Sequence, residues 1–515
     1  MEKGILIIDY GSQYTQLIGR RIREAKVYCE IYPFNKITKK LIDKLNPCGI
    51  ILSGGPNSVL DKKSPKLPLV IQKLNIPILG ICYGLQLLSI LNKGEIKKSL
   101  LREYGFAKIK ICRESKIIPK EWLKQNIDVW MSHGDHVSKA PKGFNVVAKS
   151  NNKIISIIEN KRKRIYGLQF HPEVHHTYLG YKIIKNFIFK ICKAKNNWII
   201  ESFIERKVNE LKKLIGNNKV VCGLSGGVDS SVTAYLLHKA IGKNLYCIFV
   251  DHGFLRKNES KEVLNSYKKK FKNNFITIDS SKFFLKKLKN ISDPESKRKI
   301  IGEAFVNVFN AEAKKIKNVN FLAQVTLYHD VIEIISFFGG PTSKIKSHHN
   351  VGGLPKKMKL KIVEPLRELF KDEVRDLGRK LKIKENLMSR HPFPGPGLAI
   401  RIPGFITKEK ISILQSVDFI YIDYLKEKNL YHKIWQAFAV LLPIKSVGVM
   451  GDERTYSYCC SLRAVTSVDG MTADFFMFSK ENLSEISSRI INNVKEVNRV
   501  LYDFTSKPPG TIEWE

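Results

Sequence analysis

The sequence predicts an α/β fold with two doubly wound parallel-sheet domains followed by a smaller α+β domain. Three observations predict it. Short apolar runs alternate with helical patterns through residues 1–200 and again through 201–392, as is typical of βα units and parallel sheets. Each of these two blocks has a glycine-rich turn directly after one of its apolar runs. A stretch rich in proline and glycine, Arg390–Gly397, then leads into residues 393–515, where the alternation ends.

The first block is expected to contain strands at Ile5–Asp9, Gly49–Ser53 and Pro77–Cys82, and to close with a helix over Leu179–Lys193. The three strand runs are short and apolar, as in parallel strands that are buried on both faces. Ligands of such sheets bind at the carboxyl ends of the strands. The turn after the second run, Gly54-Gly55-Pro56, therefore lies where its backbone N–H groups can meet an anion.

The third run leads into Gly80-Ile81-Cys82-Tyr83-Gly84, which has the form of a nucleophile elbow with cysteine in place of serine. The tight turn would expose the thiol of Cys82. Backbone N–H groups at the start of the following helix can stabilise a thiolate and an oxyanion. A small buried cysteine is the alternative interpretation.

A second motif, His171-Pro172-Glu173, follows the strand-like run Gly167–Phe170 and favours the catalytic interpretation. Residues two apart share one face of a strand, so we expect the side chains of His171 and Glu173 to lie together. His171 would accept the thiol proton of Cys82 while Glu173 orients the imidazole. The two motifs predict a catalytic triad.

The second block begins with the apolar run Val220–Leu224 and is expected to continue with strands at Leu245–Asp251, Phe275–Asp279 and Asn320–Gln324. A glycine-rich turn joins the first run to a helical pattern. Glycines let the backbone approach an anion, and a helix N-terminus offers free N–H groups and the positive end of its dipole. No Gly-x4-Gly-Lys-Ser/Thr motif is present, so this is not a Walker loop. The predicted phosphate cradle consists of Ser225, Gly226, Gly227, Val228, Asp229, Ser230 and Ser231.

Length and cysteine usage fit a large enzyme of the cytoplasm. A chain of 515 residues suggests two to four domains. No apolar run reaches roughly 18 residues and no signal peptide precedes the first strand, so we expect no membrane span. The nine cysteines form no paired framework, which suits a reducing compartment.

The formal net charge of +40 leaves open the alternative of a non-enzymatic chain that binds RNA. The lysines, however, are spread along the whole chain with isoleucine and asparagine, and the densest cluster is the short run Lys161–Arg164. We therefore expect no specific nucleic-acid partner. The excess charge could still steer anionic substrates.

These motifs resemble those of the glutamine-hydrolysing GMP synthetases, and the resemblance covers essentially the full chain. Residues 1–200 resemble a class I glutamine amidotransferase domain, residues 201–392 an ATP-pyrophosphatase domain, and residues 393–515 the dimerisation domain of that family. Further segments that carry the resemblance are Asp9–Gln13, Leu52–Pro56, Arg102–Gly105, Met131–Asp135, Val250–Arg256, Lys346–Pro355, Gly448–Asp452, Arg463–Gly470 and Lys507–Glu515.

The resemblance implies two half-reactions. Cys82 would release ammonia from glutamine through a glutamyl thioester, which water hydrolyses to glutamate. The Ser225–Ser231 loop would hold ATP with Mg²⁺ while an oxygen of XMP attacks the α-phosphorus. Ammonia would then displace AMP from adenylyl-XMP to give GMP. The implied partners are glutamine, ATP, XMP and a second copy of the chain, and no tightly bound organic cofactor is expected.

The resemblance also implies roles for further residues. Those expected around the oxyanion and glutamine are Gly54, Gly55, Tyr83 and Gln86. Those expected around XMP are Arg256, Gln436, Lys507 and Glu513, since Arg and Lys suit a phosphate and a carboxylate suits ring or ribose donors. Lys371 is expected to reach the ATP phosphates, and Asp229 to bind Mg²⁺. His348 and His349 are expected in a mobile lid with Gly352-Gly353 as its hinge, rather than in a zinc site.

One segment departs from the family pattern Leu-Ala-Gln-Gly-Thr-x-Tyr-Pro-Asp. Here Val325 replaces the glycine and His329 the proline, while Asp330 is retained. Valine narrows the backbone freedom and adds bulk, and histidine releases φ at the following turn. We expect these two replacements to affect adenylation and not the fold.

Another ATP-pyrophosphatase amidotransferase, such as an NAD or tRNA-modifying enzyme, is the remaining enzymatic alternative. The Lys507–Glu515 segment argues against it.

Overall fold

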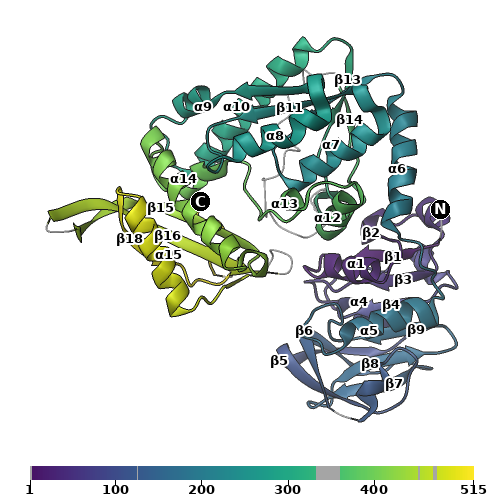
Figure 1. The fold of residues 1–515 in the computed structure, drawn as a ribbon. Helices are drawn as coiled ribbons and strands as arrows, with labels where there is room; N and C mark the ends of the chain where they lie inside the picture. The colour runs from purple at the N-terminus through teal and green to yellow at the C-terminus, as the bar shows by residue number, and fades with distance from the viewer. Residues whose placement is uncertain (1–2, 125, 332–359, 451–452, 468–472, 508) are drawn as a thin grey trace. The chain divides into compact units, whose positions relative to one another are not determined.

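The computed structural model describes residues 3–124, 126–331, 360–450, 453–467, 473–507 and 509–515 (Figure 1). The chain divides into two compact units. Unit 1 comprises residues 1–203 and 327–348, and unit 2 comprises residues 204–326 and 349–515. The lid expected around His348 and His349, with its Gly352-Gly353 hinge, lies outside the described residues.

Unit 1 is built on a nine-stranded sheet with the strand order β2-β1-β3-β4-β9-β8-β7-β5-β6. The first five strands in this order are parallel, and β8, β7, β5 and β6 continue the sheet in antiparallel pairs. The strands are β1 (Ile5–Asp9), β2 (Cys29–Pro33), β3 (Gly49–Leu52), β4 (Ile78–Ile81), β5 (Glu95–Ile111), β6 (Ile127–Lys139), β7 (Asn145–Ser150), β8 (Ile155–Asn160) and β9 (Ile165–Leu168).

The three strands predicted for the first block are confirmed as β1, β3 and β4, the last two ending one residue earlier than expected. Every residue of these strands is buried, because helices and loops cover both faces of the sheet. The helices of unit 1 are α1 (Thr15–Glu24), α2 (Lys39–Leu45), α3 (Leu69–Gln72), α4 (Tyr83–Leu91) and α5 (Gly180–Lys185). The helix expected over Leu179–Lys193 is α5 continued by a π-helical stretch, Asn186–Ile191.

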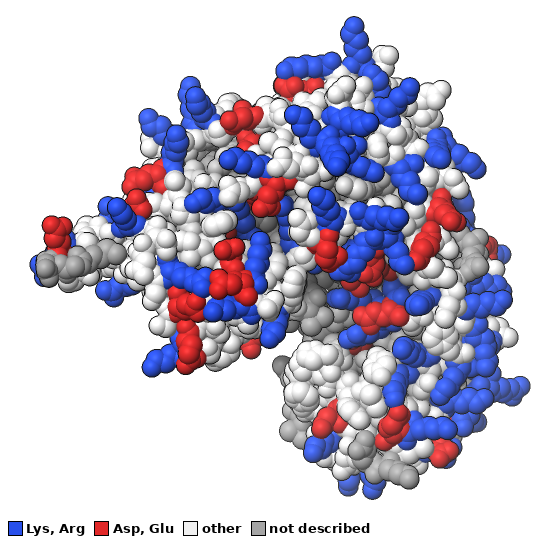
Figure 2. Space-filling model, in the orientation of Figure 1, with Lys and Arg blue, Asp and Glu red and all other residues white. Residues whose placement is uncertain are grey.

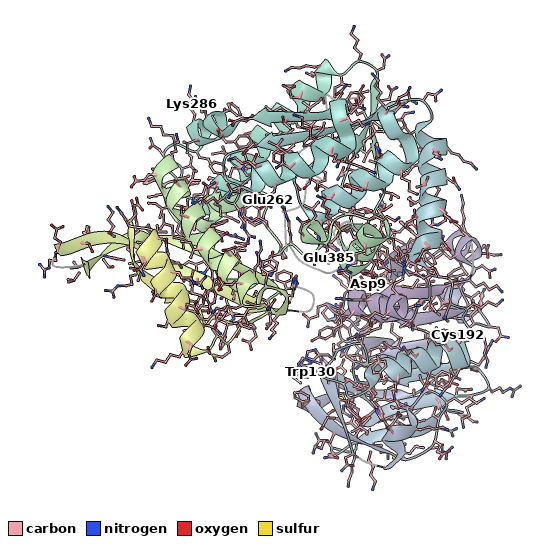
Figure 3. All side chains as sticks on the ribbon, in the orientation of Figure 1. Asp9, Trp130, Cys192, Glu262, Lys286 and Glu385 are labelled. Atoms are coloured by element: carbon pink, nitrogen blue, oxygen red, sulfur yellow. The ribbon has the colours of Figure 1, made fainter. Side chains whose placement is uncertain are left out.

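The two ends of the parallel strands of unit 1 lie at opposite edges. In Figure 3, Asp9 and Trp130 lie toward one edge of this unit and Cys192 toward the other. Asp9 is the last residue of β1, whereas a Cβ on Gly49, at the start of β3, would lie 2.3 Å from the sulfur of Cys192. The edge marked by Asp9 is therefore the carboxyl edge, where a ligand site is expected.

Unit 2 contains a five-stranded sheet, all parallel, with the strand order β12-β11-β10-β13-β14. Its strands are β10 (Lys219–Gly223), β11 (Leu245–Asp251), β12 (Phe275–Asp279), β13 (Val319–Ala323) and β14 (Lys361–Val363). The predictions for β11 and β12 are confirmed at both ends, and β13 is shifted by one residue. The helices around this sheet are α7 (Val228–Ile241), α8 (Glu259–Phe271), α9 (Ser281–Lys287), α10 (Pro294–Lys315), α12 (Lys371–Lys380) and α13 (Glu385–Met388). Helix α6 (Ile200–Ile215) begins in unit 1 and continues into unit 2.

The last part of unit 2 is α+β, as predicted. A long hairpin of β15 (Gln436–Met450) and β16 (Glu453–Thr466) is joined by β17 (Asp474–Phe475) and β18 (Val497–Tyr502), with helices α14 (Lys408–Glu427) and α15 (Lys480–Asn493). One hydrophobic core contains residues of β10, β11 and α10 together with residues of α14, β15 and β16. Side chains on both sides of the expected boundary at residue 392 therefore pack in one core.

Charged side chains are distributed over the whole face shown in Figure 2. Lysines and arginines lie on both units there and outnumber the acidic side chains, and along the right-hand edge of unit 1 they form a continuous run. Of the helices that the structure describes, none combines the length and the apolar character that crossing a bilayer requires.

Candidate active sites

Cys82 occupies the turn between β4 and α4, as the elbow motif predicts. Its φ is +51°, in the left-handed region that a non-glycine residue rarely adopts. The two glycines of the motif pack so closely against neighbouring backbone atoms that no larger residue fits at either position. A Cβ on Gly80 would lie 2.5 Å from the backbone of Gly84, and one on Gly84 would lie 2.6 Å from the oxygen of Leu52. The motif thus packs the turn closely against the neighbouring strand β3.

His171 and Glu173 lie together, but not on a strand as expected. Strand β9 ends at Leu168, and both residues belong to the turn that follows it. Nδ1 of His171 lies 2.7 Å from Oε1 of Glu173. Because β9 ends before Pro172, the turn rather than the strand periodicity brings the side chains together. The backbone N–H of His171 donates to the oxygen of Trp130 on β6, which anchors the turn.

The surroundings of His171 change its pKa. The side chains of His171 and Glu173 are 3% and 0% exposed. Burial lowers the pKa of His171, but the carboxylate of Glu173 and a hydrogen bond with Cys82 raise it to about 10. The raised pKa therefore favours the protonated, imidazolium form of His171. The thiol of Cys82 itself donates to the backbone oxygen of Ser132 over 3.5 Å.

The residues expected around the oxyanion fall into two groups. A Cβ on Gly54 would lie 3.1 Å from Cε1 of His171, so this glycine lies directly beside the triad, and one on Gly55 would lie 2.8 Å from the oxygen of Tyr10. Tyr83 and Gln86 use their side chains for structure. The hydroxyl of Tyr83 donates to the oxygen of Pro65 over 2.6 Å, and the amide of Gln86 donates to the oxygen of Asp135 over 2.8 Å. Of these two residues, the backbone N–H of Tyr83, the first residue of α4, is the group that points to an oxyanion role.

The Ser225–Ser231 loop has the form expected of a phosphate cradle. It joins β10 to α7, and Gly227 precedes the first helical residue. Gly226 has φ +79°, and a Cβ there would lie 2.7 Å from Val263. The hydroxyl of Ser230 lies 3.0 Å from that of Ser225 and donates to the oxygen of Gly227. These hydroxyls hold the loop open before the N-terminus of α7.

Lys371, at the start of α12, reaches this loop. Its Nζ lies 2.6 Å from Oδ1 and 2.5 Å from Oδ2 of Asp229. The structure therefore places Lys371 at the predicted ATP loop, paired with the carboxylate that was expected to bind Mg²⁺. Among the residues that the structure describes, no group of three or more His, Cys, Asp or Glu side chains has the arrangement of a metal site.

Three of the four residues expected around XMP lie together in unit 2. The amide of Gln436 donates to Oε1 of Glu513 over 2.6 Å. Arg256 donates from Nη2 to the oxygen of Ala437, the neighbour of Gln436, over 3.2 Å. Lys507 forms an antiparallel backbone bridge with Ala473, and the contacts that join the other three do not include it.

Sequence reasoning missed two residues that hold this cluster. Arg401 is fully buried and binds Glu513 through two parallel hydrogen bonds, Nε to Oε2 over 3.0 Å and Nη2 to Oε1 over 2.8 Å. Asp418, on α14, lies 3.2 Å from Nε of Arg256. Burial lowers the pKa of Arg256, but Asp418 raises it above the ordinary value, so the guanidinium stays charged. A carboxylate in the apolar run around residue 418 was the available signal.

The backbone at the family departure is not strained. Val325 follows β13, and its φ is not positive, so valine costs only local crowding there. The helical turn that starts at Tyr328 is capped by Asp330, whose Oδ2 accepts from the N–H of Leu327 over 2.8 Å. His329 occupies the first turn of this helix, where a proline would also fit.

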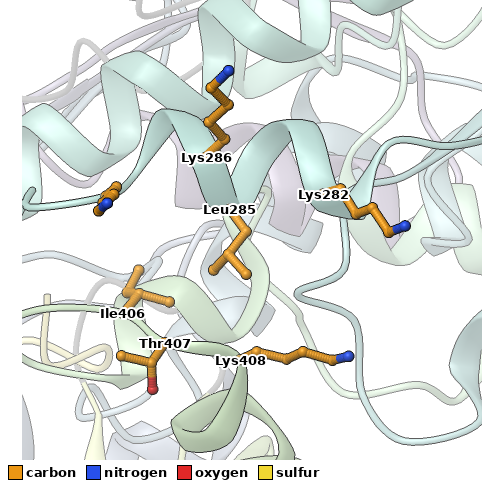
Figure 4. Close-up of a pocket in the computed structure, with 7 residues that line it drawn as sticks. Lys282, Leu285, Lys286, Ile406, Thr407 and Lys408 are labelled. Carbon is orange, nitrogen blue, oxygen red and sulfur yellow. The ribbon is translucent and has the colours of Figure 1, made fainter.

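A basic hollow of about 410 Å³ lies elsewhere in unit 2, between α9 and the start of α14. Its lining residues are Lys282, Leu285, Lys286, Lys289, Ile406, Thr407 and Lys408. In Figure 4, Lys286 points away from Lys408, so these two amino groups do not converge on one ligand. None of the residues predicted from the sequence lines this hollow.

Comparisons with known families define the class of protein. The chain matches the family described as glutamine amidotransferase class-I over residues 6–191, NAD synthase over residues 198–306 and GMP synthase C terminal domain over residues 423–514. A class I amidotransferase is thus joined to an ATP-pyrophosphatase of the NAD synthase kind.

Full-length relatives identify the family. Proteins named GMP synthase (glutamine-hydrolyzing) from Bradyrhizobium diazoefficiens, Brachyspira hyodysenteriae and Carboxydothermus hydrogenoformans are 53%, 55% and 52% identical to this chain. The alignments cover 99%, 99% and 100% of this chain and 93%, 99% and 100% of the three relatives. The chain belongs to the family of glutamine-hydrolysing GMP synthases, carbon–nitrogen ligases with glutamine as the amide donor.

Proposed function

We propose that this chain converts XMP to GMP in the cytosol, with ATP and glutamine as co-substrates and with one reaction centre in each unit. The observation that carries the proposal is the buried, hydrogen-bonded pair His171–Glu173 beside Cys82 in unit 1, because a thiol, an imidazole and a carboxylate are the groups that amide hydrolysis requires. The glycine-rich loop before α7 in unit 2 supports the use of ATP. All nine cysteines are free thiols, which supports a reducing compartment.

In the glutaminase centre, Cys82 attacks the side-chain amide carbon of glutamine. His171, held by Glu173, takes the thiol proton and passes it to the leaving nitrogen, so that ammonia departs from a glutamyl thioester. The backbone N–H groups of Gly55 and Tyr83 stabilise the oxyanion. Water activated by His171 then hydrolyses the thioester to glutamate and frees the thiol.

In the synthetase centre, the N-terminus of α7 and the loop before it bind the ATP phosphates. Lys371 adds a positive charge at the same place. The residues fit Mg²⁺ in one respect, because a magnesium ion bound to ATP needs only one or two protein carboxylates and Asp229 supplies one. Bound Mg²⁺ would neutralise phosphate charge. Lys371 must then leave Asp229 for a phosphate oxygen.

We assign the XMP site to the cluster around Glu513. Arg256 supplies a cation for the phosphate, and Gln436 and Glu513 supply polar groups for the base or ribose. Lys507 remains a further candidate for phosphate binding. A nucleophilic oxygen of XMP bound here attacks the α-phosphorus of ATP and releases pyrophosphate, after which ammonia displaces AMP.

The first test separates the two centres. Cys82→Ala should abolish GMP formation with glutamine and preserve it with an ammonium salt, because the thiol serves only the release of ammonia. Conversion of XMP is followed with each nitrogen donor, and Cys112→Ala, which removes an exposed thiol, is the matched control. Equal loss with both donors would contradict two separate centres.

We further propose that the chain is a homodimer through the β15–β16 hairpin. Its large apolar side chains Ile444, Val447, Val449 and Tyr456 are between 54% and 74% exposed, and such a stripe favours an apolar partner surface. Val449→Lys should shift the sedimentation velocity toward that of a monomer, whereas Leu69→Lys, at an equally exposed position of unit 1, should not. A parent protein that sediments as a monomer would refute the proposal.

A further inference from the structure

The last five residues, Thr511–Glu515, form neither helix nor strand, yet they are held by side chains from three distant segments. Arg463, on β16, donates to the backbone oxygens of Thr511 and Ile512 over 3.0 and 2.9 Å. Arg401 binds the side chain of Glu513. The third contact lies at the start of α10, where Lys297 and Arg298 meet Glu515.

Lys297 is the centre of this third contact. It is fully buried, and its Nζ donates to Oε2 of Glu515 over 2.5 Å and to the backbone oxygen of Ile402 over 2.8 Å. Arg298 donates to the backbone oxygen of Glu515. One ammonium group thus joins α10, the 401–402 turn and the last segment.

The burial of this ion pair carries a cost. Burial lowers the pKa of Lys297 and raises that of Glu515, so desolvation opposes the charged form of each partner. A buried charge that loses its partner is strongly unfavourable, and the pair therefore permits little displacement of either side chain. Such a contact fixes geometry better than an exposed ion pair would.

The geometry links the clamp to the cluster assigned to XMP. Arg401 and Ile402 are neighbours in the chain, and both take part in holding the last segment. Arg401 binds the side chain of Glu513. The backbone oxygen of Ile402 and the carboxylate of Glu515 both accept from Nζ of Lys297. Holding Glu515 against the 401–402 turn keeps Glu513 in register with Arg401. Glu513 in turn accepts from Gln436.

We propose that Lys297 and Arg298 are positioning residues for XMP binding, which act by clamping Glu515 so that Glu513 and Gln436 keep their places. The inference rests on the proposed function, which assigns Glu513 to XMP. Neither cation needs to touch the nucleotide. They set the affinity for XMP through the segment that they hold, and leave the binding of ATP and glutamine to other elements.

The test is a double-mutant cycle on the full-length enzyme, with the KM for XMP, ATP and glutamine measured for each variant. Lys297→Met should raise the KM for XMP about tenfold or more and change the other two by less than about twofold. Lys297→Arg, which keeps the charge, should restore most of the XMP affinity. Adding Lys297→Met to Glu513→Ala should raise the KM for XMP little beyond that of Glu513→Ala alone.

Two further variants keep the test decisive. Lys299→Met is the matched control, because this lysine is on the same helix, 70% exposed and 3.7 Å from Glu295, and its loss should change nothing. If Lys297→Met fails to fold, Glu515→Gln removes the same ion pair with little change of shape and should reproduce the selective effect. An unchanged KM for XMP, or additive effects with Glu513→Ala, overturns the clamp alone. An unchanged KM for XMP in Glu513→Ala instead overturns the assigned XMP site, and the clamp with it.

Discussion

Cys82 combines a strained backbone with a prepared proton acceptor. A positive φ in a non-glycine residue costs about 1–3 kcal/mol, and it persists only where the surroundings enforce it. Here the close contacts of Gly80 and Gly84 fix the turn that contains Cys82. The glycines of the motif therefore fix the backbone conformation of Cys82, and Cys82 supplies the reactive thiol.

The raised pKa of His171 predicts a pH dependence of stability. A group whose pKa is raised by folding contributes stability that is complete below its ordinary pKa of 6.5 and is lost as the pH rises through about 10. Glu173→Gln removes the main cause of the rise. We expect the free energy of unfolding to fall more steeply over this pH range in the parent than in the variant, as measured by urea denaturation. Parallel pH profiles would refute the assigned electrostatics.

Sequence reasoning at this scale succeeded where neighbours along the chain define the chemistry. The Cys82 elbow, the His171–Glu173 pair and the Ser225–Ser231 loop are short motifs, and the structure places each at the carboxyl edge of a sheet. Arg401 could not be found in this way. Its partner Glu513 lies 112 residues further on, and no local pattern records a contact of that span.

At the scale of elements, apolar run length predicted the seven parallel strands β1, β3, β4, β10, β11, β12 and β13 to within one residue, because strands buried on both faces tolerate few polar residues. The parallel strands β2 and β14 were not predicted. Apolar run length failed at Glu173, because the apolar run Gly167–Phe170 continues past Leu168, the last residue of β9, and Glu173 lies in the turn that follows. The presence of a strand could thus be predicted from composition, whereas its last residue could not.

The end of β13 gives a prediction at this scale. Because Val325 does not have a positive φ, Val325→Gly relieves no strain and adds backbone freedom to the unfolded chain. We expect it to lower the free energy of unfolding by about 1 kcal/mol and to change ATP–pyrophosphate exchange with XMP by less than about twofold. His329 lies in the first turn of a helix, where proline is accepted. His329→Pro should therefore leave the free energy of unfolding unchanged or raise it slightly. A large gain in exchange from Val325→Gly would show that the valine obstructs the nucleotide.

At the scale of the molecule, the net charge of +40 is spread over many elements. Basic side chains lie over both units on the face shown in Figure 2, with fewer acidic side chains among them. Specific nucleic-acid binding needs clustered phosphate contacts, which give a steep dependence on salt. We therefore expect any RNA binding to be weak and to vanish by ~0.2 M salt in filter-binding assays. Sequence-selective binding that survives this salt concentration would favour a role in RNA recognition.

The cysteines differ in the pKa and the exposure of their thiols, and this difference allows the assembled active sites in a preparation to be counted. Burial raises the pKa of Cys222 and Cys460 to about 12, and those of Cys192 and Cys247 also lie above the ordinary value. Cys82 instead meets an imidazole. Limited alkylation with iodoacetamide should therefore modify Cys82 and the exposed Cys112, and pre-incubation with glutamine should protect only Cys82. The protected mass increment in intact-protein mass spectrometry then reports the fraction of molecules in a preparation whose glutaminase centre is correctly assembled.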